Sequence, residues 1–284
     1  MEATILKRTS EDVGVIFFLV YLKRKYALLR HRDIFENLIP TFMSISSNIK
    51  AFTRKGLMMA SGILASSLLL TGCLDNLDSP SLPPAAYVSI FQGAPEAPAM
   101  DIFANQNRVN QTPVEYTQIL PYSAFYPGSR NFRFSAFNSA TSLLEKSFVL
   151  KADTVYSVFV ADKASGIDAI LVKDIWKEPS SAKAQLRFVH LSPDTEKVYL
   201  ELSGSSTPLV SESEFKSVSE FKELNPGNVT LKVKSKATGE TLIQSGTLDL
   251  KGNRVYSLIL RGLSAESTGG KKLDIQLITN FINY

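Results

Sequence analysis

Residues 184–193 read AQLRFVHLSP, and residues 86–95 read AYVSIFQGAP. Both stretches place an apolar side chain at every second position, as at Ala184, Leu186 and Phe188. A period of two is typical of a β-strand that turns one face toward a core. The two stretches lie 98 residues apart. They therefore predict a strand at the same place in two related units.

The correspondence continues along the chain. Pro127-Gly128 matches Pro226-Gly227 at an offset of 99 residues, and Tyr156 in VLKADTVYSVFV matches Tyr256 in LDLKGNRVYSLIL at an offset of 100. Each copy closes with an apolar strand pattern. An offset that drifts so little indicates a duplicated unit with short insertions in its loops.

Short alternating segments, separated by turn residues, fill the second unit. About seven strands in ~100 residues are typical of an immunoglobulin-like sandwich. The fold class that we predict is all-β, with two tandem Ig-like antiparallel β-sandwich domains; a carboxypeptidase-regulatory or transthyretin-type sandwich is the alternative. The strands expected in the second unit are 184–191, 198–203, 215–221, 229–236, 245–251, 254–262 and 273–281.

A secretory leader precedes these units. Lys50, Arg54 and Lys55 stand before an apolar run at residues 56–71. This order of charge and apolar residues is typical of a signal peptide, and the run is shorter than the ~20 residues that a spanning helix needs. MSISSNIKAFTRKG, from Met43, is a conventional signal-peptide start, so we expect translation to begin there. A genuine amphipathic or membrane-surface extension is the alternative for residues 1–42.

The only cysteine of the chain follows this run. Leu70, Thr71, Gly72 and Cys73 resemble the lipobox of bacterial lipoproteins. The resemblance implies that the Cys73 thiol receives a diacylglyceryl group, that the leader is cut before it, and that the new terminus is acylated, for example by palmitate. Leu74 then favours transport to the outer membrane, where lipid on Cys73 would hold the protein at the periplasmic or cell-surface face.

These patterns divide the chain into six segments. We predict an extension at 1–42, a signal peptide at 43–72, a tether at 73–84, a first sandwich domain at 85–176, a linker at 177–183 and a second sandwich domain at 184–284.

Charge and composition argue against several classes of partner. Residues 1–72 carry 10 basic and 5 acidic side chains, while the remainder carries 21 basic and 22 acidic ones. The basicity belongs to the leader, so we expect no nucleic-acid partner. A single cysteine excludes a disulfide framework, and a single histidine after residue 72 excludes a His-rich metal site. We expect neither a metal nor another cofactor.

The sequence RFVHLSPD, from Arg187 to Asp194, resembles the opening motif of the bacterial domain of unknown function numbered 4397. Pro226-Gly227 and the stretch GNRVYS at 252–257 resemble later features of that family, and the resemblance covers roughly residues 86–280. In the first copy Ser89 replaces the arginine and Gln92 the histidine. The family implies secreted or surface-anchored β-sandwich modules, often in tandem, and no known activity.

Two groups of residues are candidate sites. His190 follows the alternation of Leu186 and Phe188, so we expect its ring nitrogens to brace the following Ser-Pro turn by hydrogen bonds, as Gln92 would in the first copy. Tyr122, Phe125 and Tyr126 surround a Pro-Gly turn and form a candidate binding patch, with core packing as the alternative.

For two further groups of residues we expect structural roles. The acidic residues Glu212, Glu214, Glu220 and Glu223 lack the pattern of a Ca²⁺ loop and are expected on a solvated strand face. Trp176 is expected to pack between the two domains.

We therefore expect no catalytic residues and no enzyme. The function that we predict is a lipid-anchored envelope protein with a non-catalytic binding, adhesion or structural role, whose partner is a glycan or another envelope protein. The alternative is a glycan-binding accessory subunit or a hydrolase of a surface polysaccharide-processing system.

Overall fold

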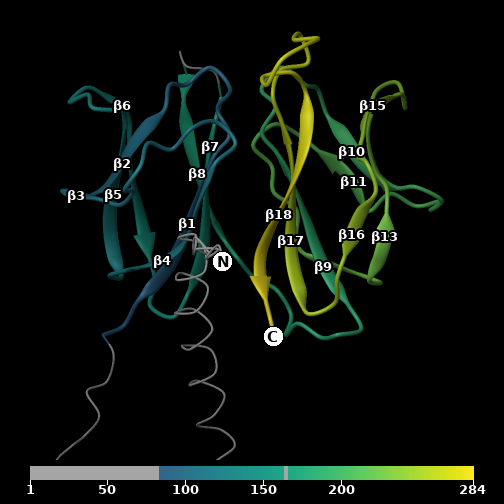
Figure 1. Cartoon of the computed structure of the whole chain (residues 1–284), viewed down its shortest axis with the longest axis horizontal. Helices are drawn as coiled ribbons and strands as arrows, with labels where there is room; N and C mark the ends of the chain where they lie inside the picture. The colour runs from purple at the N-terminus through teal and green to yellow at the C-terminus, as the bar shows by residue number, and fades with distance from the viewer. Residues whose placement is uncertain (1–82, 163–165) are drawn as a thin grey trace, which may run out of the picture. The chain divides into compact units, whose positions relative to one another are not determined.

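The computed structural model describes residues 83–162 and 166–284. Within these ranges the chain is built of strands, and no helix has the length and apolarity to cross a membrane. The predicted signal peptide and lipobox lie outside the described residues. We call residues 84–176 the N-terminal half and residues 184–284 the C-terminal half; the first contains β1–β8 and the second β9–β18, most of which are labelled in Figure 1.

The N-terminal half contains two four-stranded sheets, in the orders β4-β1-β7-β8 and β3-β2-β5-β6. The central strands β1 and β7 are parallel, and the other pairs are antiparallel. The strands are β1 (Ala86–Gln92), β2 (Met100–Ala104), β3 (Asn107–Arg108), β4 (Ile119–Phe125), β5 (Gly128–Ala136), β6 (Ser142–Leu150), β7 (Val155–Ala161) and β8 (Asp168–Lys173).

The C-terminal half repeats this plan, with sheets β12-β9-β17-β18 and β11-β10-β14-β15 and a small additional sheet β13-β16. Its central strands β9 and β17 are again parallel. The strands are β9 (Ala184–His190), β10 (Val198–Leu202), β11 (Val210–Ser213), β12 (Lys222–Leu224), β13 (Gly227–Val229), β14 (Leu231–Ser235), β15 (Thr241–Gln244), β16 (Leu248–Leu250), β17 (Arg254–Arg261) and β18 (Asp274–Ile282).

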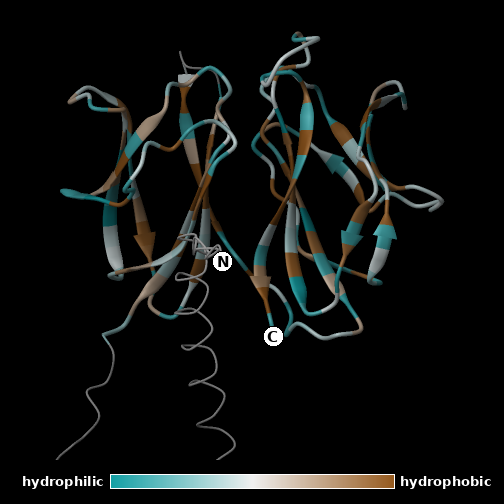
Figure 2. Cartoon of the chain, in the orientation of Figure 1, coloured by the Kyte–Doolittle hydropathy of each residue, from teal (hydrophilic) through white to brown (hydrophobic). Residues whose placement is uncertain are grey.

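Each half encloses its own core between its two sheets. Val88 and Ile90 of β1 meet Phe132 and Phe134 of β5 in the first core, and the second core is built at the corresponding positions of β9 and β14. Side chains that alternate with these face away from the core, which is why brown and teal follow each other along the strands in Figure 2. The predicted all-β sandwich class is confirmed.

The central strands bury both of their faces. Every residue of β9 is buried, and β17 is buried from Val255 to Leu260. A strand covered on two sides takes parallel neighbours more readily than one with a solvated face. The expectation of purely antiparallel sheets therefore fails at the pairs β1–β7 and β9–β17.

The second faces of these strands share an apolar cluster that joins the two halves. Phe91 and Phe159 from the N-terminal half lie in one cluster with Val189, Leu191 and Ile259 from the C-terminal half. A further cluster contains Trp176, which stacks on Phe281 at 5.7 Å between ring centroids. Trp176 thus contacts the other half, as its position before the linker suggested.

The strand predicted at 215–221 is absent. Lys216 has a positive φ of 67°, which breaks an extended run, and only Val218 makes an isolated bridge, to Val189. Phe215 and Val218 instead pack into the apolar cluster between the halves. Alternation in this stretch therefore reflects a partly buried loop and not a strand.

Candidate functional site

Polar side chains occupy the middle of the apolar surface between the halves. Ser157 lies on β7, Arg187 on β9 and Ser257 on β17, and each points away from its own core because it alternates with core residues. The side chains of Arg187 and Asp174 are 1% and 0% exposed. The central strands thus carry a charged group into the most buried part of the molecule.

These groups form a closed ring of hydrogen bonds, which we call the polar ring. Arg187 donates from Nη1 to Asp174 Oδ1 at 2.5 Å and from Nε to Ser257 Oγ at 2.7 Å. Tyr122 donates its hydroxyl to Asp174 Oδ2 at 2.6 Å and accepts a bond from Asn280 Nδ2 at 2.9 Å. Ser257 closes the ring by donating to Asn280 Oδ1 at 2.7 Å.

Ser157 bridges two neighbouring members of the ring, Arg187 and Asp174. Its hydroxyl accepts a bond from Arg187 Nη2 at 2.8 Å and donates to Asp174 Oδ2 at 2.7 Å. The ring crosses between the halves at two of its bonds, Arg187 to Asp174 and Asn280 to Tyr122. Every break in it would leave a buried polar atom without its bond, which is costly in a low-dielectric interior.

Burial sets the protonation of the phenol in this ring. Burial, and then the neighbouring Asp174 carboxylate, raise the pKa of Tyr122 well above its ordinary value. The hydroxyl therefore stays protonated and acts as the donor to Asp174. The Arg187 guanidinium lies over the rings of Phe221 at 4.6 Å and Phe159 at 5.3 Å, which adds cation–π attraction to the ion pair.

The structure does not bring Tyr122, Phe125 and Tyr126 together as an exposed patch. Tyr122 belongs to the polar ring, and Phe125 packs against the core of the N-terminal half and against Phe132. Only Tyr126 is open to solvent, with 70% of its surface exposed. Two of the three side chains, Tyr122 and Phe125, therefore make interior contacts, as the core-packing alternative predicted.

The expected bracing by His190 and Gln92 holds for only one of them. The Gln92 Oε1 atom accepts a bond from the Ala94 amide at 2.7 Å and braces its turn. His190 is wholly buried, and neither ring nitrogen has a hydrogen-bond partner among the described residues. Its ring meets Phe215 edge-on at 6.5 Å.

Burial lowers the pKa of His190 to about 4, because water no longer stabilises the charged imidazolium. Backbone groups of Glu214 and Ser213 oppose this shift without reaching hydrogen-bond geometry. The imidazole is therefore neutral at pH 7.

Ser192 and Asp194 brace the turn after His190 instead. Ser192 Oγ donates to the Gly262 carbonyl at 2.7 Å, and Asp194 accepts the amides of Ser264 and Ala265 at 2.8 and 2.9 Å. Burial raises the pKa of Asp194, but these bonds outweigh it and leave the pKa below its ordinary value. The SPD turn thus holds the loop after β17.

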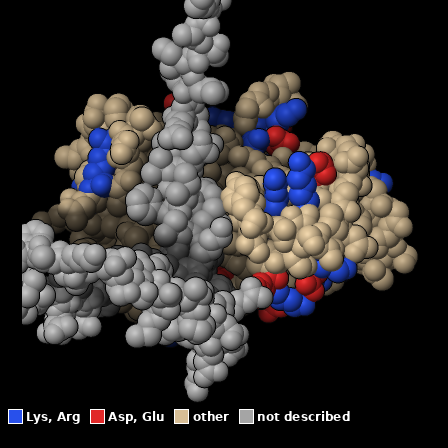
Figure 3. Space-filling model, turned by 60° about the horizontal axis from the view of Figure 1, so that its bottom comes forward, with Lys and Arg blue, Asp and Glu red and all other residues tan. Residues whose placement is uncertain are grey.

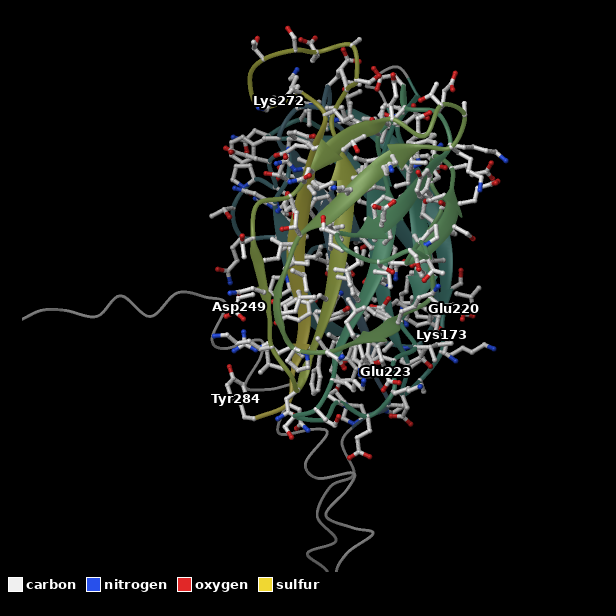
Figure 4. The ribbon with its side chains drawn as sticks, turned by 90° about the vertical axis from the view of Figure 1, so that its right-hand side faces the viewer. Lys173, Glu220, Glu223, Asp249, Lys272 and Tyr284 are labelled. Atoms are coloured by element: carbon white, nitrogen blue, oxygen red, sulfur yellow. The ribbon has the colours of Figure 1, made fainter. Side chains whose placement is uncertain are left out.

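The acidic residues of the C-terminal half form ordinary surface contacts. Glu212 pairs with Lys197 at 2.7 Å and Glu223 with Lys177 at 2.7 Å. Figure 3 shows basic and acidic side chains beside one another, and Figure 4 labels Glu220 and Glu223 on the outside of the molecule. Within residues 83–162 and 166–284, no three His, Cys, Asp or Glu side chains gather as metal ligands.

A second group of residues lies on the outward face of the sheet β3-β2-β5-β6. Arg133 lies over the Phe103 ring at 4.0 Å, and Arg108 is 6.0 Å from the Phe137 ring, which is 43% exposed. Phe103 and Arg108 are directly paired across β2 and β3. We call Phe103, Arg108, Arg133 and Phe137 the outer cluster. The patterns in the sequence did not predict it.

The sequence contains a pattern from which the polar ring could have been predicted. Arg187 and Ser257 stand near apolar residues of both alternation phases, such as Phe188 and Val189 or Leu258 and Ile259, and this composition is typical of a strand that is covered on both faces. A charged residue there must have a buried partner. The identity of that partner, Asp174, depends on the packing of one half against the other.

Comparisons with solved structures give weak similarities. The C-terminal domain of AlgF from P. aeruginosa is 22% identical, and the match covers 34% of this chain and 98% of that one with a TM-score of 0.26. Candidate cell adhesion proteins from Bacteroides ovatus ATCC 8483 and Bacteroides fragilis NCTC 9343 are 12% and 9% identical. Their matches cover 71% and 70% of this chain and 98% of each of those, with TM-scores of 0.21 and 0.20.

No curated protein matches the sequence. The family described as a domain of unknown function, DUF4397, matches residues 86–201. This span contains the RFVHLSPD motif and the whole N-terminal half, so the resemblance expected for residues 86–280 is confirmed as far as Glu201. The chain contains a DUF4397 domain at residues 86–201.

Proposed function

We propose that this chain is a lipid-anchored protein of the bacterial cell envelope whose β-sandwich body has a non-catalytic binding, adhesion or structural role. The observation that carries the proposal is the polar ring. The side chains of Arg187 and Asp174 are 1% and 0% exposed, and together with the Tyr122 hydroxyl they are engaged in joining the halves. A body fixed in this way suits presentation of a surface at the end of a tether.

The proposed attachment to a membrane rests on the sequence around Cys73. Each methylene group buried in a bilayer contributes about 0.8 kcal/mol, and two or more acyl chains make attachment stable where one does not. The described strands begin with β1 at Ala86, so residues 74–85 would connect the lipid to the body.

Cells that express the chain should incorporate an alkyne-tagged palmitate into it, and Cys73→Ser should abolish the labelling. The label should partition with the outer membrane after fractionation. Cys73→Ser also removes the only thiol, so a second variant, Gly72→Asp, serves as a control that disrupts the lipobox and keeps the sulfur. Full labelling of either variant would remove the lipoprotein proposal.

A glycan ligand is the second candidate, favoured by the outer cluster. Aromatic rings stack on the apolar faces of sugars, and the guanidinium groups of Arg108 and Arg133 can donate to hydroxyl or carboxylate oxygens. The Phe137 ring is the exposed member of this group.

A glycan array probed with the purified chain tests this candidate. If a glycan binds at the outer cluster, Phe137→Ala should weaken binding roughly tenfold, the loss expected from one stacked ring. Tyr126→Ala is the matched control, because Tyr126 is more exposed than Phe137 but lies outside the cluster. Equal losses in the two variants would exclude the outer cluster as the binding surface. Turnover of glycoside or ester substrates by the same protein would instead support the hydrolase alternative.

A further inference from the structure

The registers of the two inner sheets identify which residues of the two halves are equivalent. Ser89 is paired with Ser157 across β1 and β7, and Arg187 is paired with Ser257 across β9 and β17. Ser89 therefore occupies in the N-terminal half the position that Arg187 occupies in the C-terminal half, and Ser157 corresponds to Ser257.

Two further members of the polar ring, Asp174 and Asn280, are related in the same way. Ser157 donates to Asp174 at 2.7 Å just after β8, and Ser257 donates to Asn280 at 2.7 Å on β18. Asp174 and Asn280 thus hold equivalent positions. The polar ring contains two copies of one arrangement, of which one copy carries arginine and the other carries aspartate.

Contacts at the edge of the interface are reciprocal. Thr117 of the N-terminal half accepts a bond from Gln276 of β18 at 3.1 Å. Its counterpart Lys216 of the C-terminal half pairs with Asp168 of β8 at 3.3 Å. Both loop residues have a positive φ, 73° and 67°. The same loop of each half contacts the same edge strand of the other, which is the pattern of an interface between two copies related by a two-fold axis.

The apolar contacts follow the same rule. Phe91 and Val189 stand at one offset of 98 residues, Phe159 and Ile259 at one of 100, and all four belong to the single cluster between the halves. Each half offers the same face to the other.

We infer that the two inner sheets meet in a fused two-fold interface whose partner choice is set by one charge pair. The two faces fit each other because Asp174 lies only on the face of the N-terminal half and Arg187 only on the face of the C-terminal half. Two N-terminal faces would bury two carboxylates with Ser89 opposite them. Two C-terminal faces would bury two guanidinium groups with Asn280 opposite them. Either pairing leaves buried charges uncompensated, so each face rejects a second copy of its own kind.

This inference does not depend on the proposed function, and it makes a sign-reversal prediction for one substitution. In the wild-type chain, Asn280→Asp places a second carboxylate in the ring with Asp174 and should lower the thermal midpoint by at least about 5 °C. In a background that moves the arginine to the other half, S89R/D174N/R187S, the same Asn280→Asp supplies the missing partner. There it should raise the midpoint by a similar amount.

The four proteins of this cycle are purified as full chains and compared by calorimetry. A rescue of cooperative unfolding by Asn280→Asp in the moved-arginine background supports the inference, even if that background alone does not fold. A midpoint that falls on Asn280→Asp in both backgrounds overturns it, and so does a relocated pair that shows no cooperative transition.

Discussion

Asp174→Asn is expected to lower the free energy of unfolding by about 3–5 kcal/mol, the cost of leaving one partner of a buried ion pair alone. Arg187 is 1% exposed and has its shortest contact, 2.5 Å, to Asp174. An asparagine at 174 keeps the shape of the carboxylate, but its amide nitrogen cannot accept a bond, so one of the two acceptor positions used by Arg187 and by Tyr122 is lost. The loss would therefore report the uncompensated guanidinium charge together with one missing acceptor, and not a cavity. Urea unfolding followed by circular dichroism measures it.

The double variant Asp174→Asn/Arg187→Ser separates charge from packing. It installs at both positions the residue type that the chain carries at the equivalent position of the other half. Because neither charge remains buried, the double variant should be more stable than Asp174→Asn alone, although it loses hydrogen bonds.

A surface pair provides the control. Lys197 and Glu212 are joined at 2.7 Å but are both about half exposed, so Glu212→Gln should leave the unfolding midpoint unchanged within error.

If Asp174→Asn/Arg187→Ser is less stable than Asp174→Asn, the polar ring holds the halves through its hydrogen bonds and not through its ion pair.

The fold class followed from the sequence because strand alternation is a local property. Alternation predicts a strand at 184–191, and β9 spans Ala184–His190. The 215–221 stretch shows the limit of the same reasoning. Phe215 and Val218 are apolar because they pack between the halves, and a local pattern cannot distinguish that contact from a strand facing a core.

The site was harder to predict than the fold, because its chemistry depends on which half faces which. Gln92 and His190 hold equivalent positions, and the sequence suggested one role for both. Gln92 reaches the Ala94 amide, while the shorter, rigid imidazole of His190 finds no partner and relies on burial against Phe215. The sequence places Tyr122 in a candidate binding patch because it stands with two other aromatic residues near a Pro-Gly turn, yet its hydroxyl completes a ring that spans both halves.

Acid should destabilise the wild-type chain more than a His190→Gln variant. The folded protein holds His190 at a pKa of about 4, while the unfolded chain has an ordinary value near 6.5. Between these values the unfolded state binds a proton that the folded state does not, so the free energy of unfolding falls as the pH decreases. Above pH 6.5 both states are neutral and this contribution disappears. From pH 7.5 to 4.5 the residue should cost about 2–3 kcal/mol.

Glutamine is the appropriate replacement because Gln92 already occupies the equivalent site and folds there. Partly exposed carboxylates such as Asp168 and Asp194, whose pKa values are lowered in the fold, also respond to acid, but they are shared by both proteins and cancel in the difference. Chemical unfolding of the two proteins at each pH gives the comparison directly. Parallel stability profiles would mean that His190 is protonated in the folded state as readily as in the unfolded chain. Water or a rearranged carbonyl would then have to reach a ring that the structure holds at 0% exposure.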